Sequence, residues 1–479
     1  MADLIRQLSE IVGDRHVVSD ELGKVEFLEE RRGKFIGQGE AVILPGTVEE
    51  VQRVVRCCAS QQQPIVPQGG NTGLCGGAVS RSGDVLINLR RLNRILDIDP
   101  INQTMTVQAG CVLADIQQAA RESNCHFPLS LGAEGTCQIG GNLSTNAGGI
   151  NVLRFGNARE QVLGLEAVLP DGRLWNDMGE LRKNNTGYDL KNLLIGAEGT
   201  LGIITAAVLK LHPVPQQTET AFVALRDLEA SLELLTSARA DSGGALSSFE
   251  LVPSMGIKLA ERYIPNCSNP IQSDHEWQII IVYSGAGPDL RTTLENTLAS
   301  AFDKGTVVDA VVSSSEAQTA QIWRIREGLV EAQRHGGERY TYDVAVKVSQ
   351  VPKFIQQASS LAKQRMPGIQ PYPFGHVGDG NIHLSLFQPP GSDADQFRSR
   401  LPEFDNLIFD LVHDLKGSFS AEHGVGLLKL DEMTDYKDPV GLSMMRAIKK
   451  ALDPLNIMNP GKVIPREVSA ELGNPDSRS

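Results

Sequence analysis

Residues 64–77 read PIVPQGGNTGLCGG, in which a short apolar strand runs directly into a loop with five glycines. Glycine has no Cβ, so the backbone N–H groups of such a loop can approach the oxygens of a bound anion closely. The glycines do not follow the G-x-G-x-x-G spacing that opens a helix in Rossmann dinucleotide sites. The stretch therefore predicts an anion-binding loop in a fold other than the Rossmann fold.

Two further glycine-rich runs follow in the same part of the chain. Residues 132–149 read GAEGTCQIGGNLSTNAGG, and residues 187–202 begin with GYDL and end with GAEGTLG. The first of these runs lacks the Lys-Ser/Thr ending of a P-loop, so an NTPase is not supported. One such loop alone would be a tight turn, but three in one domain indicate a long ligand, and loops of this kind suit a pyrophosphate.

The segments around these loops predict an α+β fold. Thr47 and Glu50 have the spacing of a capping box and open a helix that continues to Cys58. The glycine loops stop near residues 213–217, PVPQQ, where we place a domain boundary. Beyond it, alternating strand and helix signals predict an antiparallel sheet covered on one face by helices. The expected strands are 64–67, 85–89, 95–98, 104–107, 221–225, 247–252, 278–283 and 343–349, and the expected further helices are 113–121, 228–240 and 290–302.

The composition narrows the class of protein. A chain of 479 residues with 41% hydrophobic residues is long enough for two to four domains with true cores. A net charge of −13 argues against nucleic acid or an anionic membrane surface as a partner. Seven cysteines without a Cys-x-x-Cys pair predict reduced thiols. The chain has no apolar signal core and no long apolar run, so we expect a soluble, cytoplasmic protein without a transmembrane segment.

Three of the nine histidines lie in two glycine-hinged turns. Residues 376–383 read HVGDGNIH, and the turn formers between the two histidines let the chain double back and bring both imidazoles together. Glycines after the pair Glu422-His423 predict a bend from which both side chains reach one point. Two imidazoles and a carboxylate form the ligand set of a catalytic zinc or manganese ion with an open position. We therefore predict His376, His383 and Glu422 as metal ligands and His423 as a base beside the metal, the alternative being histidines on tight turns.

The motifs occur in a fixed order: PQGGNTG at 67–73, QIGGN at 138–142 with NAGG at 146–149, GAEGTLG at 196–202, HVGDGNIH at 376–383, AEHGVG at 421–426 and NPGK at 459–462. This set resembles the FAD-linked D-2-hydroxyacid dehydrogenases, which are vanillyl-alcohol-oxidase-type flavoproteins. The resemblance extends from Val42 to Ile464. It implies an FAD-binding domain of two α+β subdomains at residues 1–214, a substrate and metal-binding domain at 215–452, and a C-terminal segment at 453–479 that returns to the FAD domain. Within this segment, the residues after Arg466 look like a frayed tail.

Members of this family hold the FAD diphosphate on the first two glycine loops. Relatives with a covalent flavin carry a histidine in the first loop, where this chain has Asn71-Thr72, so the resemblance implies noncovalent FAD. It also places Asn459 beside the flavin ring. The implied cofactor residues are Gly69, Gly70, Asn71, Thr72, Gly73, Gly140, Gly141, Asn142, Gly149 and Asn459.

The reaction that the resemblance implies is oxidation of a D-2-hydroxy acid to the 2-oxo acid by hydride transfer to flavin N5. A divalent Zn²⁺ or Mn²⁺ ion would lower the pKa of the hydroxyl, and His423 would take its proton. Arg326 falls where relatives bind the substrate carboxylate, and its planar fork suits bidentate pairing. Arg324 fits a solvated helix charge better.

The chain departs from the 2-hydroxyglutarate enzymes at three positions. Val330, Thr341 and Ser385 stand where these relatives have a hydroxyl residue, a lysine and an asparagine. A lost buried charge-assisted contact costs about 1.5–3 kcal/mol, which weakens the case for a second substrate carboxylate. The expected substrate is D-2-hydroxyglutarate or a related small anionic D-2-hydroxy acid, and the alternative is D-lactate or another monocarboxylate. Lys347, in the predicted strand 343–349, either supplies the missing cation or points to solvent.

Two interpretations from other classes stay open. One is a flavin-free zinc hydrolase in which His423 activates a metal-bound water, and the other is a noncatalytic flavin-binding subunit, which gives no reason for the metal cluster. Relatives pass electrons to an electron-transfer flavoprotein, a quinone or a dye, and many form homodimers. The resemblance therefore implies such an acceptor and a homodimer.

Overall fold

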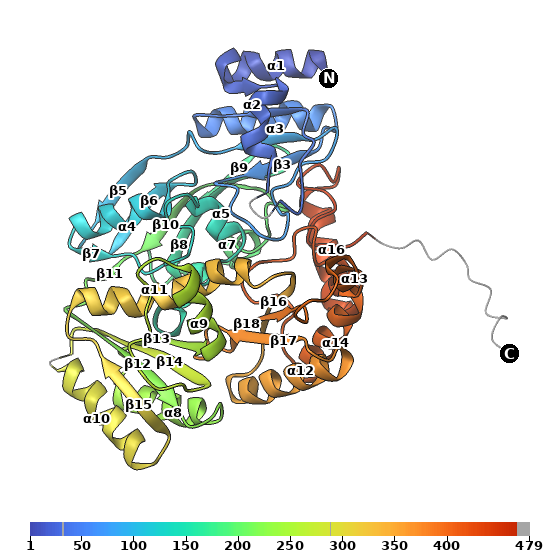
Figure 1. Cartoon of the computed structure of the whole chain (residues 1–479). Helices are drawn as coiled ribbons and strands as arrows, with labels where there is room; N and C mark the ends of the chain where they lie inside the picture. Colours follow the sequence, from blue (N-terminus) through green and yellow to red (C-terminus); the bar gives the residue numbers. More distant parts are fainter. Residues whose placement is uncertain (31–32, 288, 467–479) are drawn as a thin grey trace.

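The structure is a computed structural model that describes residues 1–30, 33–287 and 289–466. Figure 1 shows an N-terminal unit at the top, coloured blue to teal, and a C-terminal unit below it, coloured green to orange. The last helix, α16 (Pro439–Leu452), packs against the core of the N-terminal unit through Ile448 and Leu452. The combination of helices with mainly antiparallel sheets confirms the predicted α+β class.

In its described residues the N-terminal unit contains two large sheets and the short antiparallel pair β7-β11. The first has the strand order β1-β2-β4-β3, with β2, β4 and β3 parallel, and the second has the order β5-β6-β10-β8-β9 and is antiparallel throughout. The bounds are α1 (Ala2–Val12), β1 (Val17–Val18), α2 (Glu21–Leu28), β2 (Ala41–Ile43), α3 (Val48–Ser60), β3 (Ile65–Gln68), β4 (Val85–Asn88), β5 (Ile95–Asp99), β6 (Thr104–Gln108), α4 (Leu113–Glu122), β7 (Cys125–His126), α5 (Ile139–Ser144), α6 (Val152–Phe155), β8 (Val162–Val168), β9 (Leu174–Asp177), α7 (Lys191–Leu194), β10 (Ile203–Lys210) and β11 (His212–Pro213).

Helix α3 forms for the reason that the sequence indicated. The Thr47 hydroxyl accepts a hydrogen bond from the backbone N–H of Glu50, which caps the first turn. Val51, Val54, Val55 and Cys58 then recur at helical spacing and are buried in the core of the unit. The predicted helix from Thr47 to Cys58 is therefore confirmed.

The C-terminal unit begins after the predicted boundary at residue 214, with β12. It contains a four-stranded antiparallel sheet of order β13-β14-β12-β15 and a three-stranded antiparallel sheet of order β16-β18-β17. The bounds are β12 (Gln217–Leu225), α8 (Ala230–Asp241), β13 (Leu246–Pro253), α9 (Ser254–Tyr263), β14 (Trp277–Gly285), α10 (Leu290–Asp303), β15 (Val307–Val312), α11 (Glu316–Ala332), β16 (Arg339–Ala345), α12 (Val351–Arg365), β17 (Gln370–Phe374), β18 (Asn381–Phe387), α13 (Ala394–Ser399), α14 (Leu401–Asp414) and α15 (Leu430–Tyr436).

Helices cover both faces of the four-stranded sheet, where the sequence had predicted helices on one face. Ile279 and Ile281 of β14 pack into a core with α8 and α10, whereas Ile280 and Val282 pack into a second core with α9 and α11. A strand that is apolar at successive positions has two apolar faces, and each must be buried. The unbroken apolar run of β14 explains the difference.

The predicted strand 343–349 is too long. Strand β16 ends at Ala345, and Val348–Gln350 form a short 3₁₀ helix. Ala345 pairs with Asn381, the first residue of β18, so no partner strand exists beyond that point. Lys347 lies outside the strand and its side chain is exposed.

The C-terminal return joins the first sheet. The backbone N–H of Ile65 in β3 donates to the carbonyl of Ile457, and the N–H of Asn459 donates to the carbonyl of Ile65, both at 2.7 Å. Met458 thus pairs in parallel with the strand that leads into the first glycine loop. The tail that the sequence predicts after Arg466 consists of residues 467–479, which lie outside the described residues.

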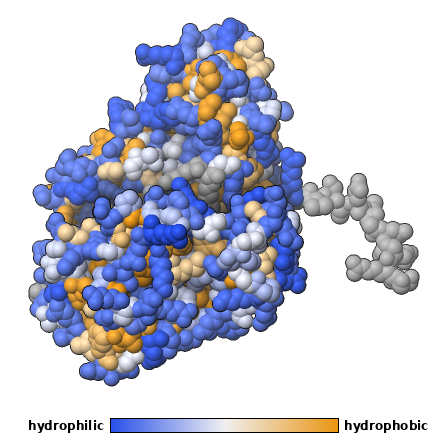
Figure 2. Space-filling model, viewed as in Figure 1, coloured by the Kyte–Doolittle hydropathy of each residue, from blue (hydrophilic) through white to orange (hydrophobic). Residues whose placement is uncertain are grey.

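Two further expectations concern cysteines and membrane helices. All seven cysteines lie in the described residues, and no disulfide joins any of them. Within the described ranges, no helix is both long and apolar enough to cross a bilayer. Figure 2 shows one face of the molecule, which is mainly hydrophilic with scattered apolar patches.

Candidate active site

The first two glycine loops touch each other. A Cβ on Gly70 would fall on the carbonyl oxygen of Thr136, and a Cβ on Gly69 would lie 3.4 Å from Gln138 Oε1. Any side chain at position 70 would therefore drive the loops apart. The loop after β3 and the loop before α5 form one continuous surface because residue 70 is a glycine.

The space at these loops fits a phosphate-bearing ligand. Among the described residues, no acceptor takes a hydrogen bond from the backbone N–H groups of residues 69–73. The side-chain oxygens Gln138 Oε1 and Asn142 Oδ1 are buried, and neither has a hydrogen-bond partner among the residues that the structure describes. Apart from its chain neighbours and, for Gly141, the backbone of its own helix, no atom of the described residues lies within 4 Å of a Cβ built on Gly73 or Gly141. Unused donors, unpartnered acceptors and open space beside glycines are features that a bound dinucleotide would fill.

Two of the asparagines predicted to bind FAD, Asn71 and Asn459, are held by the protein itself. Asn71 has a φ of 51°, and its side chain donates to the carbonyls of Phe27 and Glu29. Asn459 donates to the carbonyls of Gly77 and Glu198, at 2.9 and 2.8 Å, and its Oδ1 accepts from Lys462 Nζ at 2.6 Å. The Asn459 side chain therefore ties the first glycine loop, the third glycine run and the NPGK motif together.

The remaining predicted cofactor residues line the same loops. Thr72 is half-buried next to Gly73, and Gly140 packs so closely on Ala109 that a Cβ there would lie 2.7 Å from the Ala109 Cβ. Gly149 has a φ of 109°, and its N–H donates to Glu422 Oε1 at 2.8 Å. The second glycine loop therefore reaches the histidine cluster.

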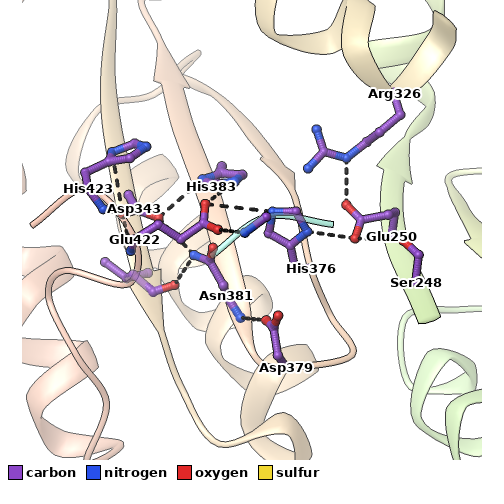
Figure 3. A network of polar contacts seen from close by, with 12 residues as sticks. Ser248, Glu250, Arg326, Asp343, His376, Asp379, Asn381, His383, Glu422 and His423 are labelled. Atoms are coloured by element: carbon purple, nitrogen blue, oxygen red, sulfur yellow. Dashed lines mark hydrogen bonds and ion pairs between the residues drawn. The ribbon is translucent and has the colours of Figure 1, made fainter. Parts of the chain in front are cut away.

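His376 and His383 approach one carboxylate oxygen. His376 follows β17 and His383 lies in β18, and their ring centroids are 5.5 Å apart. The Nε2 atoms of His376 and His383 lie 3.8 and 3.9 Å from Glu422 Oε2. Gly375 and Gly380 adopt φ values of 138° and 90° at the two ends of the turn, which lets the chain double back as predicted. The three predicted metal ligands thus come together in one place (Figure 3).

Buried carboxylates face the other ring nitrogens. Glu250 Oε1 lies 2.7 Å from His376 Nδ1, and Asp343 Oδ1 lies 3.4 Å from His383 Nδ1. A carboxylate behind a metal-binding histidine fixes its tautomer and ring orientation. Burial opposes a charge on His376, but Glu250 and Glu422 outweigh burial and raise the pKa of His376 to about 9. The same negative potential favours a divalent cation at Nε2 in place of the proton.

Asp343 organises the second part of the cluster. Its Oδ2 accepts hydrogen bonds from the backbone N–H groups of Glu422 and His423, at 2.9 and 3.0 Å, and lies 3.5 Å from His423 Nδ1. Its Oδ1 accepts from Asn381 Nδ2 at 2.9 Å. Burial favours the neutral acid, yet His423 and His383 hold the pKa of Asp343 well below its usual range.

Asp343, His383, Glu422 and His423 each offer a ligand atom, and these atoms lie within 4.8 Å of one another. This set overlaps the predicted one but replaces His376 with Asp343 and His423. The oxygens of Asp343 already accept several hydrogen bonds, which suits an orienting role. His376 is outside this group, although its Nε2 lies 3.8 Å from the same Glu422 oxygen that His383 approaches at 3.9 Å.

Arg326 is buried on α11 and shares Glu250 with His376. Its Nε donates to Glu250 Oε2 at 2.7 Å, and its guanidinium lies 5.3 Å from the centroid of the Phe374 ring. Burial opposes ionisation of Glu250, but His376 and Arg326 lower the pKa of Glu250 to about 2. Only the Nε of the guanidinium contacts Glu250 in this pair, so its terminal nitrogens take no part in it (Figure 3). Arg324 is exposed and donates to the carbonyl of Asn266, which fits the predicted solvated charge.

Sequence reasoning did not identify Glu250 and Asp343 as site residues. Both lie in apolar strands, in the stretches SSFELVP and YTYDVA, and both are almost fully buried. A buried carboxylate must be paired, so an isolated acid within an apolar strand is the signal that points to such a residue.

The structure also shows the surroundings of the three positions that depart from the 2-hydroxyglutarate pattern. Thr341 and Ser385 face each other across β16 and β18, and their hydroxyl oxygens are 3.4 Å apart. Ser385 is completely buried and donates to Gln333 Oε1 at 2.7 Å. Val330 is 51% exposed. The Ser385 hydroxyl is therefore engaged by the protein.

Comparison with known proteins identifies the family. Residues 39–177 match the family described as FAD binding domain, and residues 214–463 match the family described as FAD linked oxidases, C-terminal domain. The D-2-hydroxyglutarate dehydrogenase of Xanthomonas citri pv. viticola is 37% identical over 88% of this chain and 89% of its own length. The mitochondrial D-2-hydroxyglutarate dehydrogenase of Arabidopsis thaliana is 35% identical over 97% of this chain and 82% of its own length.

Solved structures confirm the vanillyl-alcohol-oxidase-type fold. A p-cresol methylhydroxylase with bound substrate superimposes with a TM-score of 0.76 at 16% identity, covering 97% of this chain and 96% of that one. An alkyldihydroxyacetonephosphate synthase gives 0.72 at 19% identity, covering 96% and 84%. The FAD binding domain match decides against the flavin-free hydrolase. The chain therefore belongs to the FAD-linked oxidase family, as its ordered motifs predicted.

Proposed function

We propose that the protein oxidises a D-2-hydroxy acid to the 2-oxo acid with noncovalent FAD and a divalent metal ion, the substrate being D-2-hydroxyglutarate or a related acid. Relatives at 35–37% identity carry the name D-2-hydroxyglutarate dehydrogenase, which supports the substrate class. The observation that carries the proposal is the contact between the second flavin loop and the histidine cluster, from Gly149 N–H to Glu422 Oε1. A substrate held at the cluster would thus lie next to the flavin.

Each residue of the cluster has a distinct task in this reaction. FAD supplies the acceptor for the hydride that leaves C2 of the substrate, and the metal ion supplies a positive charge that makes the substrate hydroxyl more acidic. His376, His383 and Glu422 would hold that ion, with Zn²⁺ or Mn²⁺ suited to the donor set. His423 takes the hydroxyl proton at Nε2, because Asp343 lies at its Nδ1. The terminal nitrogens of Arg326 bind the substrate carboxylate, while Glu250 fixes its Nε.

A monocarboxylate such as D-lactate is the second candidate substrate. The Ser385 hydroxyl donates its hydrogen bond to Gln333. The side chain of Val330 has no polar group, and Lys347 is exposed beyond the end of β16. These side chains leave a second substrate carboxylate without the polar partners that relatives supply. One lost charge-assisted contact would shift the preference about tenfold or more.

Anaerobic bleaching of the purified yellow enzyme tests the proposal. D-2-hydroxyglutarate, D-lactate and the achiral glycolate are added separately, and flavin absorbance is followed. The controls are L-2-hydroxyglutarate and L-lactate. We expect bleaching by at least one D-acid and by neither L-acid. A protein that stays oxidised with every acid would remove the proposed reaction, whereas faster bleaching by D-lactate would establish the monocarboxylate alternative.

We also propose that an electron-transfer flavoprotein or a quinone reoxidises the flavin and that the enzyme is a homodimer, as in relatives. Reoxidation of the substrate-reduced enzyme is compared between oxygen, a soluble quinone and an electron-transfer flavoprotein, and the mass in solution is measured by light scattering. Rapid reoxidation by oxygen alone would remove the acceptor proposal, and a monomeric mass would remove the dimer.

A further inference from the structure

The segment from Glu422 to Gly426, here called the Glu422 segment, is held from both units of the molecule. From the C-terminal unit, Asp343 Oδ2 accepts the N–H groups of Glu422 and His423. From the N-terminal unit, Gly149 N–H donates to Glu422 Oε1 at 2.8 Å. The segment therefore lies at the junction between the flavin loops and the metal cluster.

One oxygen of Glu422 contacts the second glycine loop, and the other faces the two histidines. Oε1 accepts from Gly149 in the second glycine loop, and Oε2 lies 3.8 and 3.9 Å from the two histidine Nε2 atoms. The fit is tight, because a Cβ on Gly148 would lie 2.6 Å from Glu422 Oε1. A shift of the flavin loop would thus move a proposed metal ligand directly.

Glu198, from the third glycine run, holds the other end of the Glu422 segment. Its Oε1 accepts from the backbone N–H of Val425 at 2.7 Å, and its Oε2 accepts from the N–H of Gly426 at 2.9 Å. Glu198 is 8% exposed, so these bonds are shielded from water. The proposed reaction gives Glu198 no role. Among the described residues, its carboxylate accepts hydrogen bonds only from the backbone of the Glu422 segment.

The first glycine loop completes the set. The carbonyl of Cys75 accepts the N–H of Leu427 at 2.8 Å, immediately after the segment. A Cβ on Gly426 would fall on that same carbonyl, so the chain passes here in close contact. All three glycine loops that would surround FAD therefore touch the Glu422 segment or the residue after it.

We propose that FAD and the divalent ion bind cooperatively through the Glu422 segment, with Glu198 as a positioning residue. This inference rests on the proposed function, because it requires both ligands. FAD orders the glycine loops and so fixes Gly149 and Glu198, which hold Glu422 in the geometry that the ion needs. By linkage, the ion must strengthen FAD binding by the same factor as FAD strengthens ion binding.

The wild-type holoenzyme tests the coupling without any mutation. The dissociation constant of FAD is measured by flavin fluorescence on full-length protein loaded with Zn²⁺ or Mn²⁺ and on protein treated with a chelator. We expect chelation to weaken FAD binding about fivefold or more. An unchanged FAD affinity in a protein that does bind the ion would overturn the coupling but leave the proposed reaction standing. A protein that binds FAD and bleaches with a D-acid but takes up no ion would overturn both the coupling and the metal dependence.

The variant Glu198→Gln tests the assigned residue. The amide replaces one acceptor oxygen with a donor that faces a backbone N–H, so the variant should show a smaller effect of chelation on FAD affinity than the wild type. The matched control is Glu166→Gln, because Glu166 in β8 also accepts with both oxygens, from Thr205 and Asn176, within the same unit. The control should keep the wild-type ratio. Equal ratios in wild type, Glu198→Gln and Glu166→Gln would remove Glu198 as the positioning residue.

Discussion

Glu250 acts on two functional side chains at once, since one oxygen contacts His376 and the other contacts Arg326. It is almost fully buried in β13, where an unpaired charge would be very costly. The arrangement makes His376, a proposed metal ligand, and Arg326, the proposed carboxylate-binding residue, depend on a single carboxylate. At the residue scale, the site is thus a row of carboxylates, imidazoles and one guanidinium that runs from His423 to Arg326 in Figure 3.

Replacement of Glu250 by glutamine should therefore affect both functions. The variant Glu250→Gln keeps the shape but removes the charge behind His376, and we expect metal affinity to fall about 10- to 100-fold. The KM for the hydroxy acid should rise as well, because Arg326 loses its anchor. Metal affinity is measured by competition with a chromogenic chelator and KM by steady-state kinetics. The exposed Glu331→Gln on the same helix as Arg326 should match the wild type, and normal metal affinity in Glu250→Gln would contradict the assignment.

The two histidines in β18 and in the Glu422 segment should respond differently to removal. His423→Ala should retain FAD and metal but slow flavin reduction about 10²- to 10⁴-fold, because it removes only the base. His383→Ala should lose metal and activity together. Metal content and anaerobic stopped-flow reduction separate the two outcomes, with the exposed His413→Ala as the control. Flavin reduction at a near-normal rate in His423→Ala would show that the base is wrongly assigned.

At the scale of elements, the glycine loops distinguish structural from ligand-facing glycines. A Cβ on Gly70 would fall on the Thr136 carbonyl, whereas a Cβ on Gly73 would meet no atom of the described residues within 4 Å beyond its chain neighbours. Gly70→Ala should therefore lower the thermal unfolding midpoint and weaken FAD binding. Gly73→Ala should keep the unfolding midpoint of the FAD-free protein and weaken FAD binding alone. Thermal unfolding and FAD titration of both variants check this, and intact FAD binding in Gly73→Ala would mean that FAD lies elsewhere.

Most helices and strands could be predicted because local patterns specify them. The cap at Thr47 and the apolar spacing of Val51, Val54 and Val55 define α3 within a few residues. The predicted strand 343–349 was too long because its end is not set by a local pattern. Apolar residues go on alternating past Ala345, but Ala345 pairs with Asn381, the first residue of the partner strand β18. Where a strand ends depends on its neighbour, which a local pattern does not contain.

At the scale of the whole molecule, the end of the chain completes the unit formed by its beginning. Ile457 and Met458 are almost fully buried beside β3, more than 380 residues away in sequence. A chain ending at Leu452 should lose about 3–6 kcal/mol from these two side chains and release FAD at a lower temperature. A chain ending at Arg466 keeps all of these contacts and is the control. Thermal release of FAD, followed by flavin fluorescence, measures the difference, and equal release temperatures would contradict a stabilising role for the return.

The sequence alone determined the class of the protein: the α+β fold, the glycine loops, the family and the three residues His376, His383 and Glu422 that meet in one cluster. These features are readable because they depend on glycine conformation, apolar periodicity and short motifs, all of which are local. Only the tertiary structure decided which carboxylates stand behind the histidines and that Gly149 and Glu198 reach the Glu422 segment. Those contacts join residues from distant parts of the chain, and their partners are chosen by how the two units pack.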